Sequence, residues 1–427
     1  MQTRINPPRK AWDRLCQRPA LTQGVLDETV SKVFEQVKQG GDSALLALTE
    51  KYDGVKLTSV KIPIRSEAAE SVGLSSALKG AVDTAYQNIW KFHCGQAERE
   101  VQRMETQPGV ECWQEPRAIE RVGLYVPGGT APLISTMLML GVPARIAGCR
   151  EIVVCTPPDN TGTGNKAIRY AAALCGVSQL YMVGGAQAVA AMTFGTESVP
   201  QVDKLFGPGN QYVTAAKTYA QRFGLAIDMP AGPSEVLVLA DDLARPDFVA
   251  ADLLSQAEHG PDSQVVLVTT SRTLQNEVKN ELNRQIRLLK RSEIAAEALK
   301  KSMSLWFPTM NTALSFANAY APEHLIMQVD EAEVWASRVQ NAGSVFIGPY
   351  TPESAGDYAS GTNHTLPTGG WAKTYSGVSV ASFQKTVTFQ SITPVGLRGL
   401  APAILSLANA EGLTAHARAV SIRVDNL

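Results

Sequence analysis

The chain has 427 residues, of which 44% are hydrophobic and 19% are charged, with 39 basic residues against 40 acidic ones. This balance is typical of a globular protein and gives no basic excess, so we expect neither nucleic acid nor a membrane as a partner. The length exceeds what one hydrophobic core usually supports, which predicts two or more domains.

The opening segment and the cysteines indicate a cytoplasmic protein. Residues 1–16 are polar and lack the apolar stretch of a signal peptide. The chain contains no apolar run of about 18 residues, the length that would span a bilayer. The six cysteines lie far apart without a CxxC pair, which is typical of reduced structural thiols in the cytoplasm.

Residues 1–22 show little periodicity, and we interpret them as an N-terminal arm to which the sequence assigns no role. Apolar side chains at helical spacing then predict a helix over 25–37. Gly40-Gly41 ends this helix, and a second one is expected from Asp42 or Ser43, whose short side chains suit a helix cap.

More helix is predicted over 75–105, and residues 106–119 are predicted to be irregular. Together, residues 23–118 are expected to form a helical N-terminal region that packs on the core. A different pattern starts at Val122.

From there, short apolar runs alternate with longer amphipathic segments, which is typical of parallel α/β sheets covered by helices. The clearest helix is predicted over 272–300, with apolar side chains on one face and charged ones on the others. The predicted strands are 121–126, 151–155, 179–183, 202–206, 225–229, 235–240, 264–269, 303–307, 323–328 and 343–348. The other predicted helices are 164–175, 186–194, 210–222, 246–259 and 312–320.

A junction at Ala231-Gly232-Pro233-Ser234 divides this region into two comparable halves. We therefore predict an α/β fold with two adjacent, incomplete Rossmann-like parallel-sheet domains, over 119–230 and 231–373, with ligands bound where the two meet. Residues 374–427 are predicted to form an extended C-terminal tail. Because this tail is rich in apolar residues, it must fold back on its own chain or reach a partner subunit.

Four of the five histidines lie in polar stretches that contain glycine and proline, and only His93 falls outside. Gln256 and His259 are three residues apart on a predicted helix and share one face. A histidine at a helix end is also favoured by the helix dipole, so this pair alone does not indicate a metal. Asp357 and His416 would complete a set of nitrogen and oxygen ligands appropriate to zinc.

Glu323 and His324 follow Pro322 at the start of an apolar run. A histidine near neutral pH accepts a hydroxyl proton, and a glutamate activates a water. Neighbouring side chains on a strand point to opposite faces, so both reach one substrate only if the backbone is still irregular, which the proline permits. The alternative is a strand start with two solvated polar residues.

Several glycine-rich segments are candidates for binding loops. Residues 355–364 carry Asp357, Asn363 and His364 among glycine and serine, and we interpret them as a functional loop rather than a solvated linker. Residues 125–132, 183–187 and 206–210 each end a predicted strand and precede a predicted helix, where backbone donors would hold a pyrophosphate. None of the three is a GxGxxG, and each one singly is equally an ordinary tight turn.

Long motifs carry a more specific signal than spacing does. In unbroken order from about residue 20 to the end, the chain closely resembles the histidinol dehydrogenase family. The motifs that carry this resemblance are residues 228–236, 256–264, 321–325, 343–346 and 356–368.

The resemblance implies a zinc-dependent, NAD-linked enzyme of histidine biosynthesis that oxidises L-histidinol through L-histidinal to L-histidine in two hydride transfers. It implies one zinc ion per subunit, with Glu323 and His324 as the acid/base pair. The implied zinc ligands are Gln256, His259, Asp357 and His416, which also lie against the substrate together with His324. The other implied substrate contacts are Ser234, Glu353, His364 and Glu411, and the implied NAD contacts are Tyr125, Gln187 and Asn210.

The resemblance also implies a homodimer with exchanged tails, in which Glu411 and His416 complete the site of the neighbouring subunit. Two other readings remain open. A related zinc and NAD dehydrogenase could oxidise another small alcohol, although the complete substrate-binding set argues against it. A zinc hydrolase could use Glu323 and a metal-bound water, but four protein ligands leave such a metal no open position.

Overall fold

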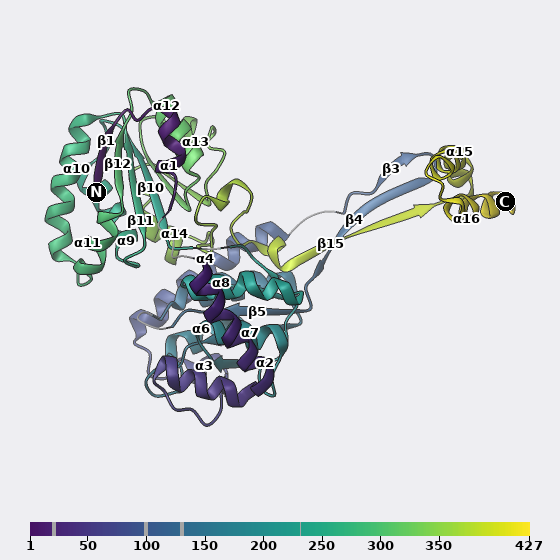
Figure 1. Cartoon of the computed structure of the whole chain (residues 1–427), viewed down its shortest axis with the longest axis horizontal. Helices are drawn as coiled ribbons and strands as arrows, with labels where there is room; N and C mark the ends of the chain where they lie inside the picture. The colour runs from purple at the N-terminus through teal and green to yellow at the C-terminus, as the bar shows by residue number, and fades with distance from the viewer. Residues whose placement is uncertain (19–22, 98–100, 129–131, 231) are drawn as a thin grey trace.

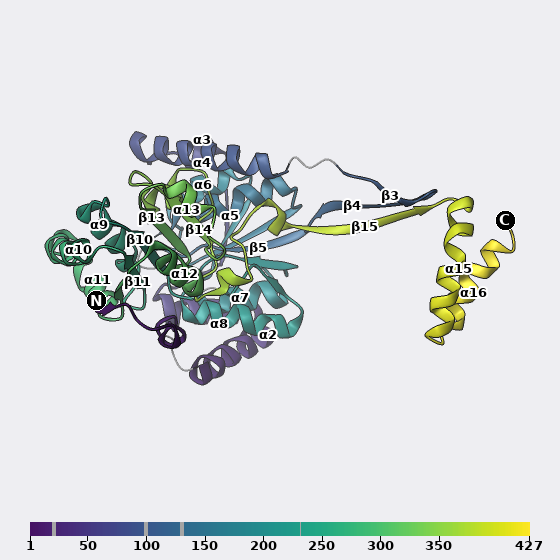
Figure 2. The same ribbon diagram turned by 90° about the horizontal axis from the view of Figure 1, so that it is seen from above.

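The computed structural model describes residues 1–18, 23–97, 101–128, 132–230 and 232–427. Two α/β lobes lie side by side, and a long arm projects from them and carries the C-terminus (Figure 1). Figure 2 shows the same arm from above, extending well beyond both lobes. The predicted α/β fold with two adjacent parallel sheets is confirmed. Ala231 of the predicted junction and residues 129–131 of the first predicted turn lie outside the described residues.

The first lobe contains a six-stranded sheet in the order β2-β7-β6-β5-β8-β9, in which every strand except β2 is paired in parallel. Taken in chain order, β5 to β9 follow the order 3-2-1-4-5 of a Rossmann sheet that lacks its sixth strand. The strands are β2 (Lys61–Pro63), β5 (Arg121–Tyr125), β6 (Glu151–Thr156), β7 (Gln179–Met182), β8 (Lys204–Phe206) and β9 (Ala226–Ile227).

The second lobe repeats this order in a fully parallel sheet, β1-β12-β11-β10-β13-β14. The central strand β10 is buried along its whole length, which explains its continuous apolar run. The N-terminal segment adds β1 at the edge of this sheet. The strands are β1 (Gln2–Ile5), β10 (Glu235–Ala240), β11 (Gln264–Thr269), β12 (Met303–Trp306), β13 (His324–Gln328) and β14 (Ser344–Ile347).

Helices cover both sheets and bury their apolar faces against the strands. In the first lobe these are α2 (Gln23–Asp53), α3 (Glu67–Glu70), α4 (Ser76–Ala97), α5 (Ile134–Ala147), α6 (Lys166–Leu174), α7 (Gly185–Phe194) and α8 (Gln211–Ala220). In the second lobe they are α1 (Trp12–Leu15), α9 (Pro246–Ala257), α10 (Arg272–Gln285), α11 (Ser292–Lys300), α12 (Met310–Tyr320), α13 (Ala332–Ala336) and α14 (Glu353–Tyr358). None of the helices within the described ranges is long and apolar enough to cross a bilayer.

Two helix predictions differ in their outcome. The break predicted at Gly40-Gly41 is confirmed, because Gly41 is non-helical (φ 52°, ψ −133°) inside α2. The single helix predicted over 272–300 is wrong, because α10 ends at Gln285 and α11 starts at Ser292. A straight helix of that length would extend about 43 Å, roughly twice the length of a six-residue strand. The break lets both helices pack on the same sheet.

The prediction that residues 106–119 are irregular is also wrong. They contribute to β3 (Met104–Gln107) and β4 (Val110–Ala118), and β4 pairs antiparallel with β15 (Gln384–Ile392). This ribbon forms the arm, and α15 (Pro394–Ala410) and α16 (Thr414–Val424) lie at its tip. The ribbon is exposed for much of its length, so it lacks the apolar alternation of a half-buried strand. Met104 already lies in β3, so the helix predicted over 75–105 was too long.

Candidate active site and metal centre

The predicted acid/base pair lies at the amino end of β13, next to the amino end of β10. His324 is the first residue of β13, and Glu323 precedes the strand. Because Glu323 is not yet part of the strand, the two side chains are not forced to opposite faces. Oε2 of Glu323 lies 3.6 Å from Nδ1 of His324. The irregular backbone that the sequence required at this position is therefore present.

The surroundings of His324 assign the roles of its two ring nitrogens. Nδ1 lies 3.3 Å from the backbone carbonyl oxygen of Glu235. A carbonyl only accepts hydrogen bonds, so Nδ1 carries a proton, and Nε2 is the ring nitrogen that gains or loses the second one. Nε2 is buried and has no hydrogen-bond partner among the described residues. Oδ1 of Asp357 lies 3.4 Å from Nε2 and would pair with this nitrogen when it is protonated. Nε2 is therefore the ring atom of His324 that is placed to exchange a proton with a substrate.

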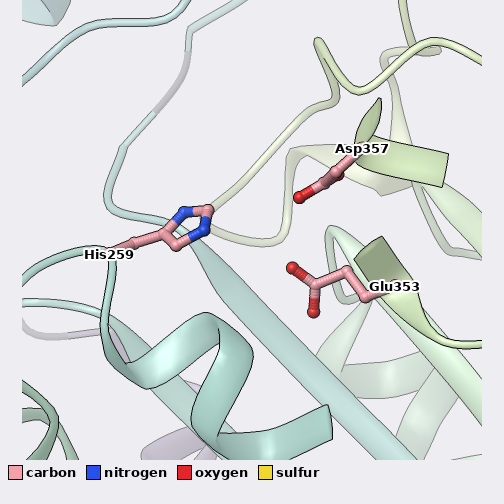
Figure 3. A group of neighbouring side chains, drawn as sticks. All are labelled: His259, Glu353 and Asp357. Atoms are coloured by element: carbon pink, nitrogen blue, oxygen red, sulfur yellow. The ribbon is translucent and has the colours of Figure 1, made fainter. Parts of the chain in front are cut away.

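Two carboxylates and a second imidazole converge next to this pair (Figure 3). Glu353 and Asp357 are four residues apart on α14, so both lie on one face of this short helix. His259 lies just beyond the end of α9 and faces them. One ligand atom of each residue lies within 4.8 Å of the other two. This group of three offers the nitrogen and oxygen donors of a metal site.

Gln256 completes the group from inside α9, where its side chain is fully buried. Its amide lies against Glu353. In the orientation that satisfies hydrogen bonding, the nitrogen donates to Oε1 of Glu353, and the oxygen lies 3.1 Å from the backbone nitrogen of Glu235, whose N–H it shares with Oε2 of Glu323. In the reverse orientation the amide oxygen faces the carboxylate, which is favourable only with a cation between the two oxygens.

The buried carboxylates shift the pKa values of one another and of His324. Burial raises the pKa of Glu353 well above its ordinary value, and the charges of Asp357 and Glu323 add to this. Burial on its own lowers the pKa of His324, but the carboxylates of Glu353 and Glu323 outweigh it and raise this pKa well above its usual value. Burial also raises the pKa of Asp357, but His324 outweighs it and the pKa is lowered. The site therefore has an excess of negative charge.

His364 joins the two lobes next to the site. Its Nε2 lies 3.0 Å from Oγ1 of Thr136 on α5, and its Nδ1 lies 2.9 Å from the backbone oxygen of Asp357. Asn363 donates to the carbonyl of Met139 at 2.6 Å, also on α5. The predicted loop is thus attached to the first lobe, although its first residues belong to α14. Both ring nitrogens of His364 therefore have protein partners.

Ser234, another predicted substrate contact, lies directly before β10, at the sheet edge that carries Glu323 and His324.

The predicted NAD contacts lie in the first lobe, at the carboxyl ends of the strands, whereas the acid/base pair lies at the amino ends of strands in the second lobe. Tyr125 ends β5, and its hydroxyl accepts from the N–H of Gly185 at 3.1 Å. Burial raises the pKa of Tyr125 to about 12, so this hydroxyl keeps its proton. Gln187 is buried in the first turn of α7. Asn210 is exposed and caps α8 through its side-chain oxygen.

A buried ion pair holds the turn before Asn210. Nζ of Lys217 lies 2.5 Å from Oδ1 of Asp228, and it donates to the carbonyl of Gly207 at 2.8 Å. Asp228 accepts from the N–H of the same glycine at 2.8 Å. Gly207 has φ 128°, and a Cβ there would collide with the carbonyl of Tyr125. Only glycine therefore fits this approach of the β8 turn to the end of β5.

A sequence model of histidinol dehydrogenases matches residues 16–424. The chain belongs to the histidinol dehydrogenase family. The histidinol dehydrogenase of Bacteroides thetaiotaomicron is 55% identical over 423 residues, which is 99% of this chain and 98% of the relative. That of Vibrio parahaemolyticus is 52% identical over 97% of this chain and 96% of its own length. The crystal structure of histidinol dehydrogenase from Elizabethkingia anophelis superposes with a TM-score of 0.96 at 50% identity, covering 100% of this chain and 98% of that one.

Membership in the histidinol dehydrogenase family confirms the resemblance inferred from the motifs. Two predicted site residues do not join the others within one chain. Glu411 and His416 are exposed on the pair of helices at the tip of the arm. Figures 1 and 2 show this tip far from α9 and α14. A single chain thus brings together three of the four expected zinc ligands, Gln256, His259 and Asp357.

Sequence reasoning missed two features of this histidinol dehydrogenase site. Glu353 was expected only as a substrate contact, yet it lies within the metal-ligating group. The Glu-x-x-x-Asp spacing could have revealed this, because it places two carboxylates on one helical face. Glu235, buried under the acid/base pair, carries no such local signal, since it reads as the polar first residue of a strand.

Proposed function

We propose that the protein oxidises L-histidinol to L-histidine through L-histidinal, with two hydrides transferred to NAD and a zinc ion in the site. Family membership over nearly the whole chain supports the overall reaction. One observation supports the mechanism: the buried Nε2 of His324, which has no hydrogen-bond partner among the described residues, lies next to the group of His259, Glu353 and Asp357. A base beside a cation site is what oxidation of a metal-held alcohol requires.

The residues of the site fit a zinc ion. The carboxylates of Glu323, Glu353 and Asp357 lie close together around His324. A divalent cation would offset their negative charge and reduce their effect on the pKa of His324. Gln256, His259 and Asp357 would hold the ion together with His416 of the exchanged arm. When bound, zinc would act as a Lewis acid that accepts the nitrogen lone pairs of the substrate's imidazole and amine and so fixes the position of the substrate. Glu353 adjoins these ligands and is assigned to the substrate amine.

The carboxyl edge of the first sheet fits NAD. Tyr125 and Asn210 follow β5 and β8, which flank the point where the strand order reverses. Gln187 lies on α7, and this helix begins beside the hydroxyl of Tyr125. Oδ2 of Asp53 is buried without a partner among the described residues, and Oδ1 would lie 3.3 Å from a Cβ on Gly184. A carboxylate there is a suitable acceptor for a ribose hydroxyl. NAD supplies the hydride acceptor.

In the first oxidation, Nε2 of His324 accepts the hydroxyl proton as the hydride leaves the alcohol carbon. The products are the aldehyde, NADH and a protonated His324. Donation from Nδ1 to the carbonyl of Glu235 keeps the ring in the tautomer that this step needs. The imidazole must release its proton before the second oxidation.

In the second oxidation, the aldehyde must first gain a water, because a hydride leaves only a carbon that bears a hydroxyl. Glu323 accepts a proton from that water as the water oxygen bonds to the aldehyde carbon, which leaves the hydrate with one negatively charged oxygen and one hydroxyl. The backbone N–H of Glu235 donates to Oε2 of Glu323 at 2.9 Å and so orients the carboxylate. His324 then accepts a hydroxyl proton of the hydrate as the second hydride leaves, and the product is the carboxylate of L-histidine.

A homodimer with exchanged arms would complete the site. The pair of helices α15 and α16 exposes large apolar side chains that its own lobes do not cover. These are Val395, Leu407, Leu413 and Ile422. In such a dimer, Glu411 and His416 reach the site of the partner.

A biosynthetic role and six free cysteines fit a cytoplasmic location.

A mixed dimer tests this exchange. An inactive His416 variant and an inactive His324 variant, refolded together, are expected to regain part of the activity. One site in a mixed dimer then receives an intact His324 from one chain and an intact His416 from the other. Each variant refolded alone is the control. Absence of recovery, with mixed dimers demonstrated by differently tagged chains, would contradict a shared site.

The proposed reaction is tested by the ratio of NADH formed to L-histidinol consumed, with zinc supplied or removed by a chelator. Two NADH per substrate are expected, with activity lost on chelation and restored by zinc. One NADH with free aldehyde would remove the hydration role of Glu323. No NADH would reject histidinol and direct the search to other small alcohols.

A further inference from the structure

An arginine of the N-terminal segment lies under the acid/base pair. Nε and Nη2 of Arg18 donate to the two carboxylate oxygens of Glu235 at 2.8 and 2.9 Å. The two side chains are only 13% and 1% exposed. Nη2 also donates to the carbonyl of Tyr320 at 2.7 Å, and the guanidinium lies 3.7 Å from the centre of the Tyr320 ring. Arg18 is thus held in one geometry by contacts with β10 and with the end of α12.

Glu235 in turn touches the acid/base pair through three polar groups. Its backbone N–H donates to Oε2 of Glu323 at 2.9 Å. Its Oε1 accepts from the backbone N–H of Glu323 at 3.3 Å. Its carbonyl oxygen lies 3.3 Å from Nδ1 of His324. The same residue therefore orients the carboxylate of Glu323, its backbone and the ring of His324.

We propose that Arg18 and Glu235 are positioning residues, which hold Glu323 and His324 in their working geometry from beneath. This inference rests on the proposed function, because it is that function which assigns proton transfer to the two supported residues. Neither Arg18 nor Glu235 touches the reacting atoms. The N-terminal segment, which had no role in the sequence, thereby becomes part of the active-site support.

The physical reason is the charge of Glu235. Burial raises the pKa of this carboxyl and the nearby Glu323 adds repulsion, while Arg18 opposes both. Without the guanidinium, the carboxylate must take up a proton or move towards water, because a buried unpaired charge is costly. Either change weakens the hydrogen bonds through which Glu235 orients Glu323. A small displacement of the reacting groups lowers kcat more than it raises KM.

The chain offers a matched control pair in the first lobe. Arg169 makes the same two-point contact with Glu70, at 2.7 and 2.9 Å, and the side chains are 18% and 5% exposed. Arg18→Met and Arg169→Met should therefore lower the Tm by comparable amounts. Only Arg18→Met should lower kcat, by about 10- to 100-fold. Its KM for L-histidinol and its zinc content should stay close to those of the unmodified protein.

Two further variants separate positioning from folding. Glu235→Gln in the Arg18→Met background leaves an uncharged acceptor for the N–H of Glu323, and part of the lost kcat should return. Arg18→Lys keeps the charge but loses the two-point contact, so its kcat should fall between those of the other proteins. If Arg18→Met lowers the Tm as the control does but keeps its kcat, the pair is only structural and the proposal is wrong.

A readout without turnover distinguishes this proposal from the reaction itself. The chain has only five histidines, so ¹⁵N spectra of the zinc-loaded, histidine-labelled protein can follow the His324 ring. We expect Nδ1 to be protonated in the unmodified protein, and a mixture of tautomers in Arg18→Met. An unchanged tautomer would contradict the positioning role. Absence of NADH from the unmodified protein, with the tautomer shift present, would reject the substrate but keep the positioning role.

Discussion

Replacing His324 with alanine is expected to lower kcat for L-histidinol by about 10²- to 10⁴-fold, the usual contribution of a general base. The reason is the loss of Nε2, the buried ring nitrogen that has no hydrogen-bond partner among the described residues. Zinc should stay bound, because the expected ligands are Gln256, His259, Asp357 and His416. Initial rates of NADH formation and elemental analysis of the same preparation measure both quantities.

His93→Gln serves as the control for this experiment. His93 is also a buried histidine with Nδ1 bonded to a backbone carbonyl, that of Ile89 at 2.8 Å, but it lies on α4 outside the acid/base pair, and its other ring nitrogen lies 3.4 Å from Nδ2 of Asn363. We expect this variant to lower the Tm while kcat changes little. Loss of zinc from the His324 variant would show that His324 is a ligand rather than the base.

Replacing His259 with asparagine is expected to weaken zinc affinity at least about 100-fold. Mutation of residues that only hydrogen-bond to metal ligands already lowers metal affinity about 10- to 100-fold. His259 supplies the one imidazole that a single chain brings to the group with Glu353 and Asp357. Without it, carboxylate and amide oxygens remain, and these bind zinc less selectively. Metal content after dialysis against a graded series of chelator concentrations measures the effect, and activity should fall in parallel.

Glu258→Gln is the matched control, because it changes the neighbouring residue at the same helix end and lies outside the ligating group. It should retain zinc like the unmodified protein. If His259→Asn also kept its full metal content, the ligand role of His259 would be refuted. The zinc ion would then have to be assigned to other residues near α14.

The two sheets present the site in opposite ways. In the first sheet the expected cofactor contacts follow the carboxyl ends of β5 and β8, as is usual for parallel sheets. In the second sheet Ser234, Glu323 and His324 lie at the amino ends of β10 and β13. The bonds from His364 to Thr136 and from Gln211 to Asp262 join the lobes near these ends. The candidate active site therefore lies where the amino edge of the second sheet meets the first lobe.

The sequence by itself determined the two α/β halves and the family. Parallel strands buried on both faces, such as Glu235–Ala240 and Gln264–Thr269, appear as short apolar runs because burial acts on each residue locally. The motifs around His259, His324 and Asp357 carry the candidate site residues in contiguous segments, so resemblance could find them without knowledge of the fold.

Only the tertiary structure decided which distant residues meet. Arg18 and Glu235 are 217 residues apart, and β4 finds its partner in β15 near the other end of the chain. It also put Glu353 next to His259 and Asp357, and it placed His416 on α16 at the tip of the arm. Periodicity reports only how each segment faces its surroundings. Pairing between segments depends on the packing of the whole chain, and in the proposed dimer the place of His416 would depend on a second copy.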